Sequence, residues 1–303
     1  MKFYVGITDY DWFTYLKDSP ELDEVNFWQP SGNVAFRAIE PGAPFLFKLH
    51  SPRNYIVGGG FFVKHSIIPM SLAWEAFGNK NGADNYNEFR TRRYRYKKEE
   101  ADDSLIGCII LSSPFFFEED SWIPAPEDWS SSIVKGKTYE TVSPIGSMLW
   151  REVEARIGLG RFQVVREPIA RFGREQIVTP RLGQGGFRII VTDAYNRKCA
   201  ITAEKTLPAL EAAHIKSYSE EGPHEINNGI LLRADLHKLF DLGYITITKE
   251  LKVEVSRKIK EKYENGRDYY AMQGIALRNL PMNNKEYPSL EFIEWHNAQI
   301  YLG

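Results

Sequence analysis

The stretch "LEAAHIKSYSEEGPHEINNGILLRADLHKLFDLG", residues 210–243, decides how the second half of this chain is interpreted. It holds three of the six histidines in the chain, His214, His224 and His237. The apolar runs predict a strand ending near His214, a second strand from Gly229 and a helix carrying His237. A strand-borne histidine facing a helix-borne one suits metal-assisted hydrolysis. One imidazole can accept a proton from water while the other holds a divalent cation.

LEAAHI followed by NNGILLRADLHKLFD resembles the HNH nuclease motif in its ββα-metal form. The resemblance is to restriction endonucleases in which a helix ending in AYNRKCAIT precedes the motif, and it covers about residues 180–303. His214, Asn228 and His237 follow one another at intervals of 14 and 9 residues. By this resemblance His214 is the general base, Asn228 orients the catalytic loop and His237 is a metal ligand.

The chain departs from the motif beside the base. Many HNH enzymes carry an aspartate or histidine there as a second metal ligand, whereas this chain has Ala213. Asp241, four residues after His237, shares its helix face and is the first alternative ligand, although an aspartate before Leu-Gly is often a turn former. Glu211 is a weaker alternative. His224 has no place in the motif and is expected to be a solvated bystander, or at most a phosphate contact.

The ligand types predict which metal is used. A single imidazole with oxygen ligands suits hard cations, so Mg²⁺ or Mn²⁺ is expected, one ion for each HNH site. The motif is not flanked by CxxC pairs, so no structural zinc is expected.

The bulk properties limit the class of protein. At 303 residues the chain suits two domains, and its net charge of −2 gives no global sign of a polyanion partner. MKFYVGITDY is no signal peptide, and no apolar run approaches the roughly 20 residues of a membrane span. Two cysteines cannot form a disulfide framework. A cytoplasmic protein without membrane contact is expected.

Residues 1–140 are rich in strand signals, namely FLFKLH (45–50), YIVGGGFFV (55–63) and IGCIIL (106–111). The glycine run predicts a bulge, and PMSLAWEAFG (69–78) predicts a short helix. KFYVGITDYDWFTYL, EVNFWQPSG, PGAPFLFKLH and YIVGGGFF, in this order, resemble the PUA superfamily, which includes EVE, ASCH and SRA domains. The resemblance implies a small β-barrel with short helices, so the whole chain is expected to be α+β.

Relatives in that group bind a modified or flipped base in an aromatic pocket. By resemblance Trp28 would stack on the base, while Gln29, Ser31 and Asn33 would read its edge. Stacking on an aromatic ring is worth ~1–3 kcal/mol per base. The alternative is a structural role, because a tryptophan in a small β domain is more often part of the core. Trp12 is a weaker aromatic candidate.

Basic residues gather in two further places. RTRRYRYKKEE (90–100) includes Arg92 and Arg93, candidate DNA phosphate contacts, although the acidic residues that follow would equally make a self-neutralising solvated helix. Residues 141–185 carry seven arginines and are interpreted as a basic connector to the HNH domain at 186–303.

Together these features predict a type IV-like, modification-dependent restriction endonuclease. Its expected partner is double-stranded DNA carrying a modified base, with modified cytosine favoured. A homodimer is expected because one HNH site cuts one strand. Two alternatives remain: a nicking or structure-specific HNH nuclease without modification dependence, and a non-catalytic nucleic-acid-binding protein with a degenerate HNH unit. Ala213 favours the last, whereas His214, Asn228 and His237 argue against it.

Overall fold

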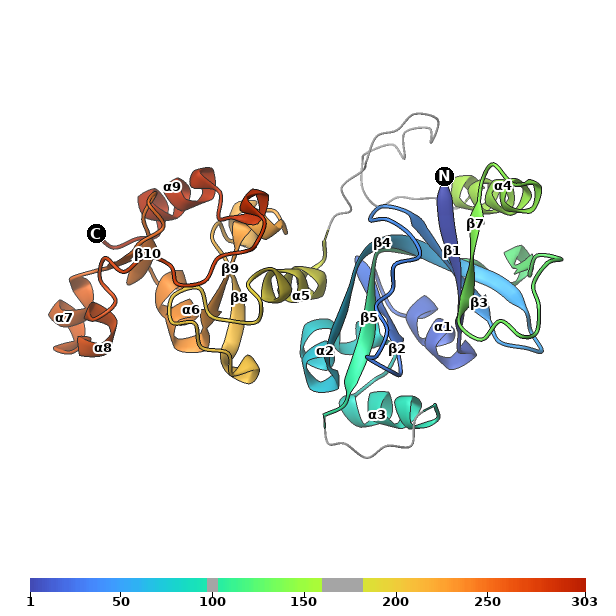
Figure 1. The fold of residues 1–303 in the computed structure, drawn as a ribbon, viewed down its shortest axis with the longest axis horizontal. Coiled ribbons are helices and arrows are strands. Elements are labelled where there is room, and N and C mark those ends of the chain that lie inside the picture. The colour runs from blue at the N-terminus through green and yellow to red at the C-terminus, as the bar shows by residue number, and fades with distance from the viewer. Residues whose placement is uncertain (97–102, 160–181) are drawn as a thin grey trace. The chain divides into compact units, whose positions relative to one another are not determined.

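The computed structural model describes residues 1–96, 103–159 and 182–303 (Figure 1). The chain divides into two compact units, Met1–Leu182 and Gly183–Gly303, and each has its own buried core. None of the helices within the described ranges is long and apolar enough to cross a membrane.

The first unit is built on a large mixed sheet. Its strands are β1 (Lys2–Thr8), β2 (Glu24–Gln29), β3 (Pro44–Leu49), β4 (Tyr55–Pro69), β5 (Leu105–Phe116), β6 (Ile123–Pro124) and β7 (Gly136–Glu140). They follow the order β2-β5-β4-β3-β1-β7, and β6 pairs with β4. The β1–β3 pair is parallel and the other pairs are antiparallel. The strands predicted within 45–50, 55–63 and 106–111 are confirmed.

The predicted closed barrel is not found. Among the described strands, β2 and β7 stand at opposite ends of the order and do not pair with each other. Closing a sheet requires its two outer strands to hydrogen-bond, and apolar runs predict strands without saying which strands become neighbours. The first unit is therefore an α+β domain on an open sheet, and its place in the PUA superfamily stays a prediction.

Helices and short turns surround this sheet. They are α1 (Tyr10–Lys17), α2 (Met70–Phe77), η1 (Gly78–Asn81), α3 (Tyr86–Tyr94), η2 (Glu119–Ser121) and α4 (Pro144–Leu159). Trp12 of α1 is 3 % exposed and lies edge-on to Phe27 and Phe47, at 5.5 and 5.1 Å between ring centroids. Trp12 is therefore a core residue.

The glycine run of β4 marks a bulge, as predicted. The register between β4 and β5 shifts between Gly59 and Phe61. At Gly58, where φ is +158°, a Cβ would lie 2.2 Å from the carbonyl oxygen of Phe115. Only glycine lets the two backbones approach so closely there.

Part of the segment predicted as a connector packs on the core of the first unit. In α4, Leu149, Trp150 and Val153 are buried in the cluster that contains Phe3. Residues 160–181, with five of the arginines noted above, lie outside the described residues. A connecting role for 141–185 stays a prediction.

The second unit contains two short hairpins and several helices. In chain order these are α5 (Gln184–Ala194), η3 (Leu207–Ala209), β8 (Leu210–His214), η4 (Tyr218–Glu220), η5 (Ile226–Asn228), β9 (Gly229–Arg233), α6 (Ala234–Asp241), β10 (Ile245–Ile247), β11 (Val253–Val255), α7 (Lys258–Tyr263), α8 (Arg267–Tyr270), η6 (Asn284–Glu286) and α9 (Leu290–Gln299). The predicted strand–loop–strand–helix unit is confirmed.

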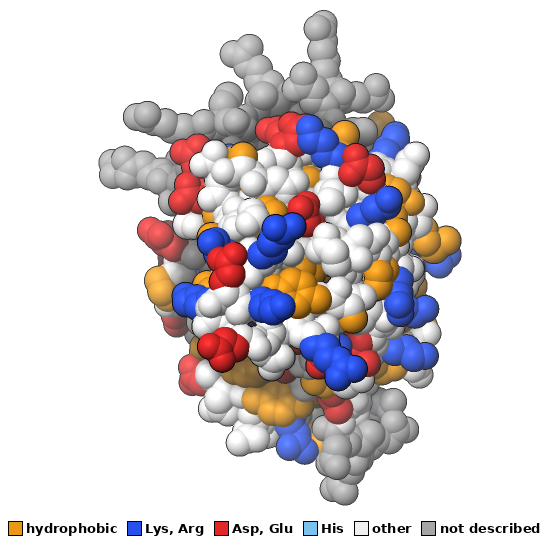
Figure 2. Space-filling view, turned by 90° about the vertical axis from the view of Figure 1, so that its left-hand side faces the viewer, with side chains coloured by type: hydrophobic (Ala, Val, Ile, Leu, Met, Phe, Trp, Pro, Cys, Tyr) orange, Lys and Arg blue, Asp and Glu red, His pale blue; other side chains and the backbone are white. Residues whose placement is uncertain are grey.

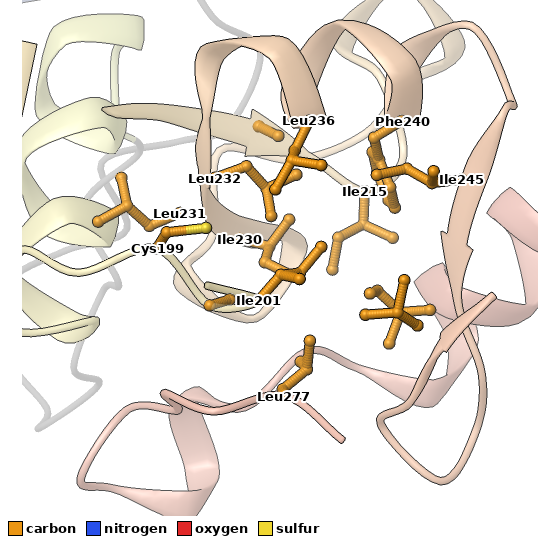
Figure 3. Close-up of a cluster of buried hydrophobic side chains, with 14 of the residues drawn as sticks. Cys199, Ile201, Ile215, Ile230, Leu231, Leu232, Leu236, Phe240, Ile245 and Leu277 are labelled. Atoms are coloured by element: carbon orange, nitrogen blue, oxygen red, sulfur yellow. The ribbon is translucent and has the colours of Figure 1, made fainter. Parts of the chain in front are cut away.

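The core of the second unit explains why β9 is an uninterrupted apolar run. Helices α5 and α6 both pack on the β8–β9 pair, and Ile230, Leu231 and Leu232 are all fully buried. Figure 3 shows Ile230 and Leu232 on the side of Leu236 and Phe240 of α6, and Leu231 beside Cys199. The surface at the end of this unit that carries α7 and α8 is polar, and Figure 2 shows basic and acidic side chains interspersed over it.

Candidate active site

Asn228 closes the loop between the two strands of the HNH-like unit. Its side chain is fully buried, accepts a hydrogen bond from the Lys216 backbone N–H (2.8 Å), and donates to the carbonyls of Lys216 (2.9 Å) and Pro223 (2.8 Å). The Ile215 N–H donates to the Asn228 carbonyl at 2.9 Å. These contacts join both ends and the middle of the loop, as a loop-orienting residue would.

Gly229 brings helix α5 against the strands. A Cβ at this position would lie 2.4 Å from Cγ2 of Val191 and 3.1 Å from the ring of Phe187. Because the glycine leaves this space, Phe187 stacks on His214 with ring centroids 3.8 Å apart and an interplanar angle of 10°. The base candidate is thus held against an apolar ring at the end of β8.

His214 is kept neutral by its surroundings. Burial, together with the charges of His224 and His237, lowers its pKa to about 4, although the charge of Asp241 opposes this shift. A buried imidazole with this pKa carries no proton charge at pH 7 and has a lone pair for a proton from water. His237 and Asp241 therefore lie close enough to act electrostatically on the base candidate.

The expectation that His224 is a solvated bystander was wrong. Its Nδ1 lies 2.9 Å from Nε2 of His214, and its ring stacks on Tyr218 with centroids 4.6 Å apart. Its position follows from the bond between Asn228 and the carbonyl of Pro223, the preceding residue. No spacing rule pointed to this contact, because it depends on how the loop closes.

His237 lies between two carboxylates. Its Nδ1 is 2.6 Å from Oε2 of Glu211, and its Nε2 is 3.3 Å from Oδ2 of Asp241. Burial pulls the pKa of His237 down, but the hydrogen bonds and charges of Asp241 and Glu211 outweigh it and raise that pKa. Both acidic residues considered as alternative ligands thus contact the predicted metal ligand.

Two side chains, His237 and Asp241, are arranged so that both could bind one divalent cation. Within the described ranges, no group of three or more His, Cys, Asp or Glu side chains is arranged to hold a metal. Adjacent ligands of an octahedral ion lie about 3 Å apart, which matches the 3.3 Å between His237 Nε2 and Asp241 Oδ2. Water and substrate phosphate oxygens commonly complete such a shell.

In this chain the position beside the base, Ala213, belongs to the core, and a different residue of β8, Glu211, contacts the predicted metal ligand. Strand alternation places both on the same face of β8. Ala213 is fully buried in the core and offers no ligand, while Glu211 reaches Nδ1 of His237. A carboxylate at the far nitrogen of a metal-binding histidine fixes its tautomer and orientation. Glu211 is therefore suited to orienting the ligand.

Trp28 and Gln29, two of the residues proposed for base recognition, lie on opposite faces of β2. Trp28 is half-buried and packs against the core: its Nε1 donates to the carbonyl of the buried Asn81 (3.0 Å), and its ring lies edge-on to the buried Phe89. Gln29 faces the other way by strand alternation. A Cβ at Gly107 would lie 3.0 Å from Oε1 of Gln29 and 2.9 Å from Nε2 of His65, so these side chains converge there. Sequence reasoning did not single out His65.

The two remaining pocket candidates are close together after β2. The Asn33 backbone N–H lies 3.4 Å from the hydroxyl oxygen of Ser31, and Asn33 is exposed. Their part in base recognition stays a prediction.

The arginines predicted to contact phosphate are largely buried in α3. Arg92 is 9 % exposed and pairs with Glu88 at 2.7 Å, while Arg93 is 2 % exposed. A phosphate contact would require these guanidinium groups to move outwards, so the geometry does not favour this role. Residues 97–100 of the basic run lie outside the described residues.

A match to a known protein family supports this site. Residues 199–248 match the sequence model of a family described as HNH endonuclease. No curated protein matches the chain. A solved structure described as "Modification dependent TagI restriction endonuclease" is 13 % identical with a TM-score of 0.30, over 97 % of this chain and 81 % of that chain. That likeness is too low to support conclusions. The family match spans β8, the loop, β9 and α6, with His214, Asn228 and His237, so the chain carries an HNH endonuclease domain.

Proposed function

We propose that this protein is a modification-dependent DNA endonuclease that hydrolyses phosphodiester bonds with His214 as the general base. The observation that carries the proposal is His214 itself. It is neutral, stacked on Phe187, and within electrostatic range of the His237–Asp241 pair inside the HNH domain.

In the proposed reaction His214 accepts a proton from a water molecule. The hydroxyl adds to phosphorus, one backbone P–O bond breaks, and the departing oxygen gains a proton from solvent. The approaching anionic phosphate raises the pKa of His214 towards the range in which general bases work best. His237 and Asp241 would hold Mg²⁺ or Mn²⁺, which when bound stabilises charge on the phosphate oxygens.

The first unit would select the DNA. Gln29 and His65 converge over Gly107, and the Phe36 backbone N–H donates to Nδ1 of His65 at 3.3 Å. An amide, an imidazole and a neighbouring phenyl ring could bind the edge and face of an unstacked base. Trp28 lies on the opposite face of β2 and could contribute to base binding only from there. A modified cytosine remains the expected base.

The assembly and location follow from this reaction. Each chain has one HNH site, so cutting both strands calls for a homodimer on double-stranded DNA. A cytoplasmic location is proposed as well. It agrees with the state of the two cysteines, Cys108 and Cys199, which are buried thiols outside any disulfide.

Matched plasmids test the function. The protein with Mg²⁺ or Mn²⁺ is incubated with one plasmid in unmodified form and in a form carrying modified cytosines, and His214→Ala is the control. Cleavage of only the modified plasmid by the wild type supports the proposal. Equal cleavage of both would indicate a nuclease without modification dependence. Binding without cleavage of any DNA would indicate a degenerate HNH unit.

A further inference from the structure

We propose that His224 is a positioning residue for the general base: its Nδ1 accepts the Nε2–H of His214, which leaves the lone pair of His214 on Nδ1 for water. The inference rests on the proposed hydrolytic function of this site. It assigns a chain-specific role to a loop histidine that lies outside the HNH motif.

The two nitrogens of His214 have different surroundings. Nε2 lies 2.9 Å from Nδ1 of His224, within hydrogen-bonding distance. Among the described residues none hydrogen-bonds to Nδ1 of His214. A neutral imidazole carries one proton, and the nitrogen without it is the base. If Nε2 holds that proton, Nδ1 is the basic atom.

His224 is held in place from three sides. Its ring stacks on Tyr218 at an interplanar angle of 11° and lies 5.7 Å from the ring of Phe187. The carbonyl of the preceding residue, Pro223, accepts a hydrogen bond from Asn228. Asn228 thus orients the loop and, through it, the acceptor nitrogen that faces His214.

The shape of the loop also depends on Gly222. A Cβ there would lie 1.9 Å from the carbonyl oxygen of Lys216, and its N–H donates to the Ser217 carbonyl at 2.9 Å. The two arms of the loop therefore touch just before His224. This contact limits how far the imidazole can move from the base.

The direction of the hydrogen bond matters chemically. When His214 takes a proton from water at Nδ1 it becomes an imidazolium, and its Nε2–H becomes a stronger donor. The acceptor nitrogen of His224 stabilises that cation, as the residue hydrogen-bonded to a catalytic histidine does in other enzymes. The reverse direction would leave the proton of His214 on Nδ1 and occupy its lone pair at Nε2, so neither nitrogen could accept a proton from water.

Nitrogen NMR of the full-length protein labelled with ¹⁵N-histidine tests the tautomer without any substrate. The chain has six histidines, so single substitutions assign the signals. We expect His214 to carry its proton on Nε2 in the wild type and in His224→Asn, whose side-chain oxygen can take the place of Nδ1. In His224→Leu we expect a mixture of both tautomers. A wild-type His214 protonated on Nδ1, or a tautomer unchanged in His224→Leu, overturns the proposal.

Cleavage kinetics provide a second readout. We expect His224→Leu to lower kcat by about 10-fold or more with KM nearly unchanged, and His224→Asn to recover most of the loss. Glu225→Gln, an exposed neighbour, is the control and should match the wild type. Equal loss in the Leu and Asn variants would overturn the acceptor role. If the wild type cleaves no DNA, the proposed function fails, while the NMR result still decides the contact.

Discussion

Replacing Asn228 by alanine should open the catalytic loop. The substitution removes three hydrogen bonds and leaves the Lys216 N–H and the carbonyls of Lys216 and Pro223 without their partner. At about 1 kcal/mol for each bond, the loop loses about 3 kcal/mol. Since 1.4 kcal/mol corresponds to a factor of ten, the open loop becomes on the order of 100 times more populated.

Hydrogen exchange measured by mass spectrometry on peptides covering 215–228 reports this opening directly. We expect exchange to accelerate about 100-fold there in Asn228→Ala and to change little in α9, with cleavage activity reduced in parallel. Asn228→Asp should be no better, because its carboxylate would face two carbonyl oxygens.

The neighbouring Asn227 is the matched control. Its side-chain Oδ1 is buried without a hydrogen-bond partner among the described residues. Asn227→Ala should therefore leave exchange in the loop close to that of the wild type. If Asn228→Ala exchanges within about twofold of the wild type, the three bonds do not hold the loop and the reasoning is wrong.

Gly229→Ala should destabilise the protein by roughly 1–3 kcal/mol, because the new Cβ meets Val191 at 2.4 Å. Calorimetry would show this against Gly158→Ala, where the Cβ meets nothing within 4 Å. Glu211→Gln should weaken Mn²⁺ binding roughly tenfold in calorimetric titration without DNA, and unchanged affinity would contradict its orienting role. His296 is 2 % exposed and burial lowers its pKa to about 4, below an unfolded value near 6.5. Its contribution is complete above pH 6.5 and is lost as pH falls towards 4, by up to roughly 3 kcal/mol. Urea unfolding at pH 7 and 4.5 measures this, and His296→Gln should reduce the difference.

By itself the sequence determined the local elements and the core of the candidate site. Apolar periodicity and glycine placement predicted β8, β9 and α6, because these signals depend on neighbours along the chain. The spacing of His214, Asn228 and His237 was equally readable, since the motif lies within one strand–loop–strand–helix unit.

Only the tertiary structure decided the contacts made across space. The two end strands of the first sheet, β2 and β7, do not pair with each other, and the strand runs predicted at 45–50, 55–63 and 106–111 could not show this. His224 reaches the base because Asn228 ties down the Pro223 carbonyl, and Glu211 reaches His237 because α6 packs on its face of β8. Loop closure and helix packing set these distances, and neither depends on a residue's neighbours in sequence alone.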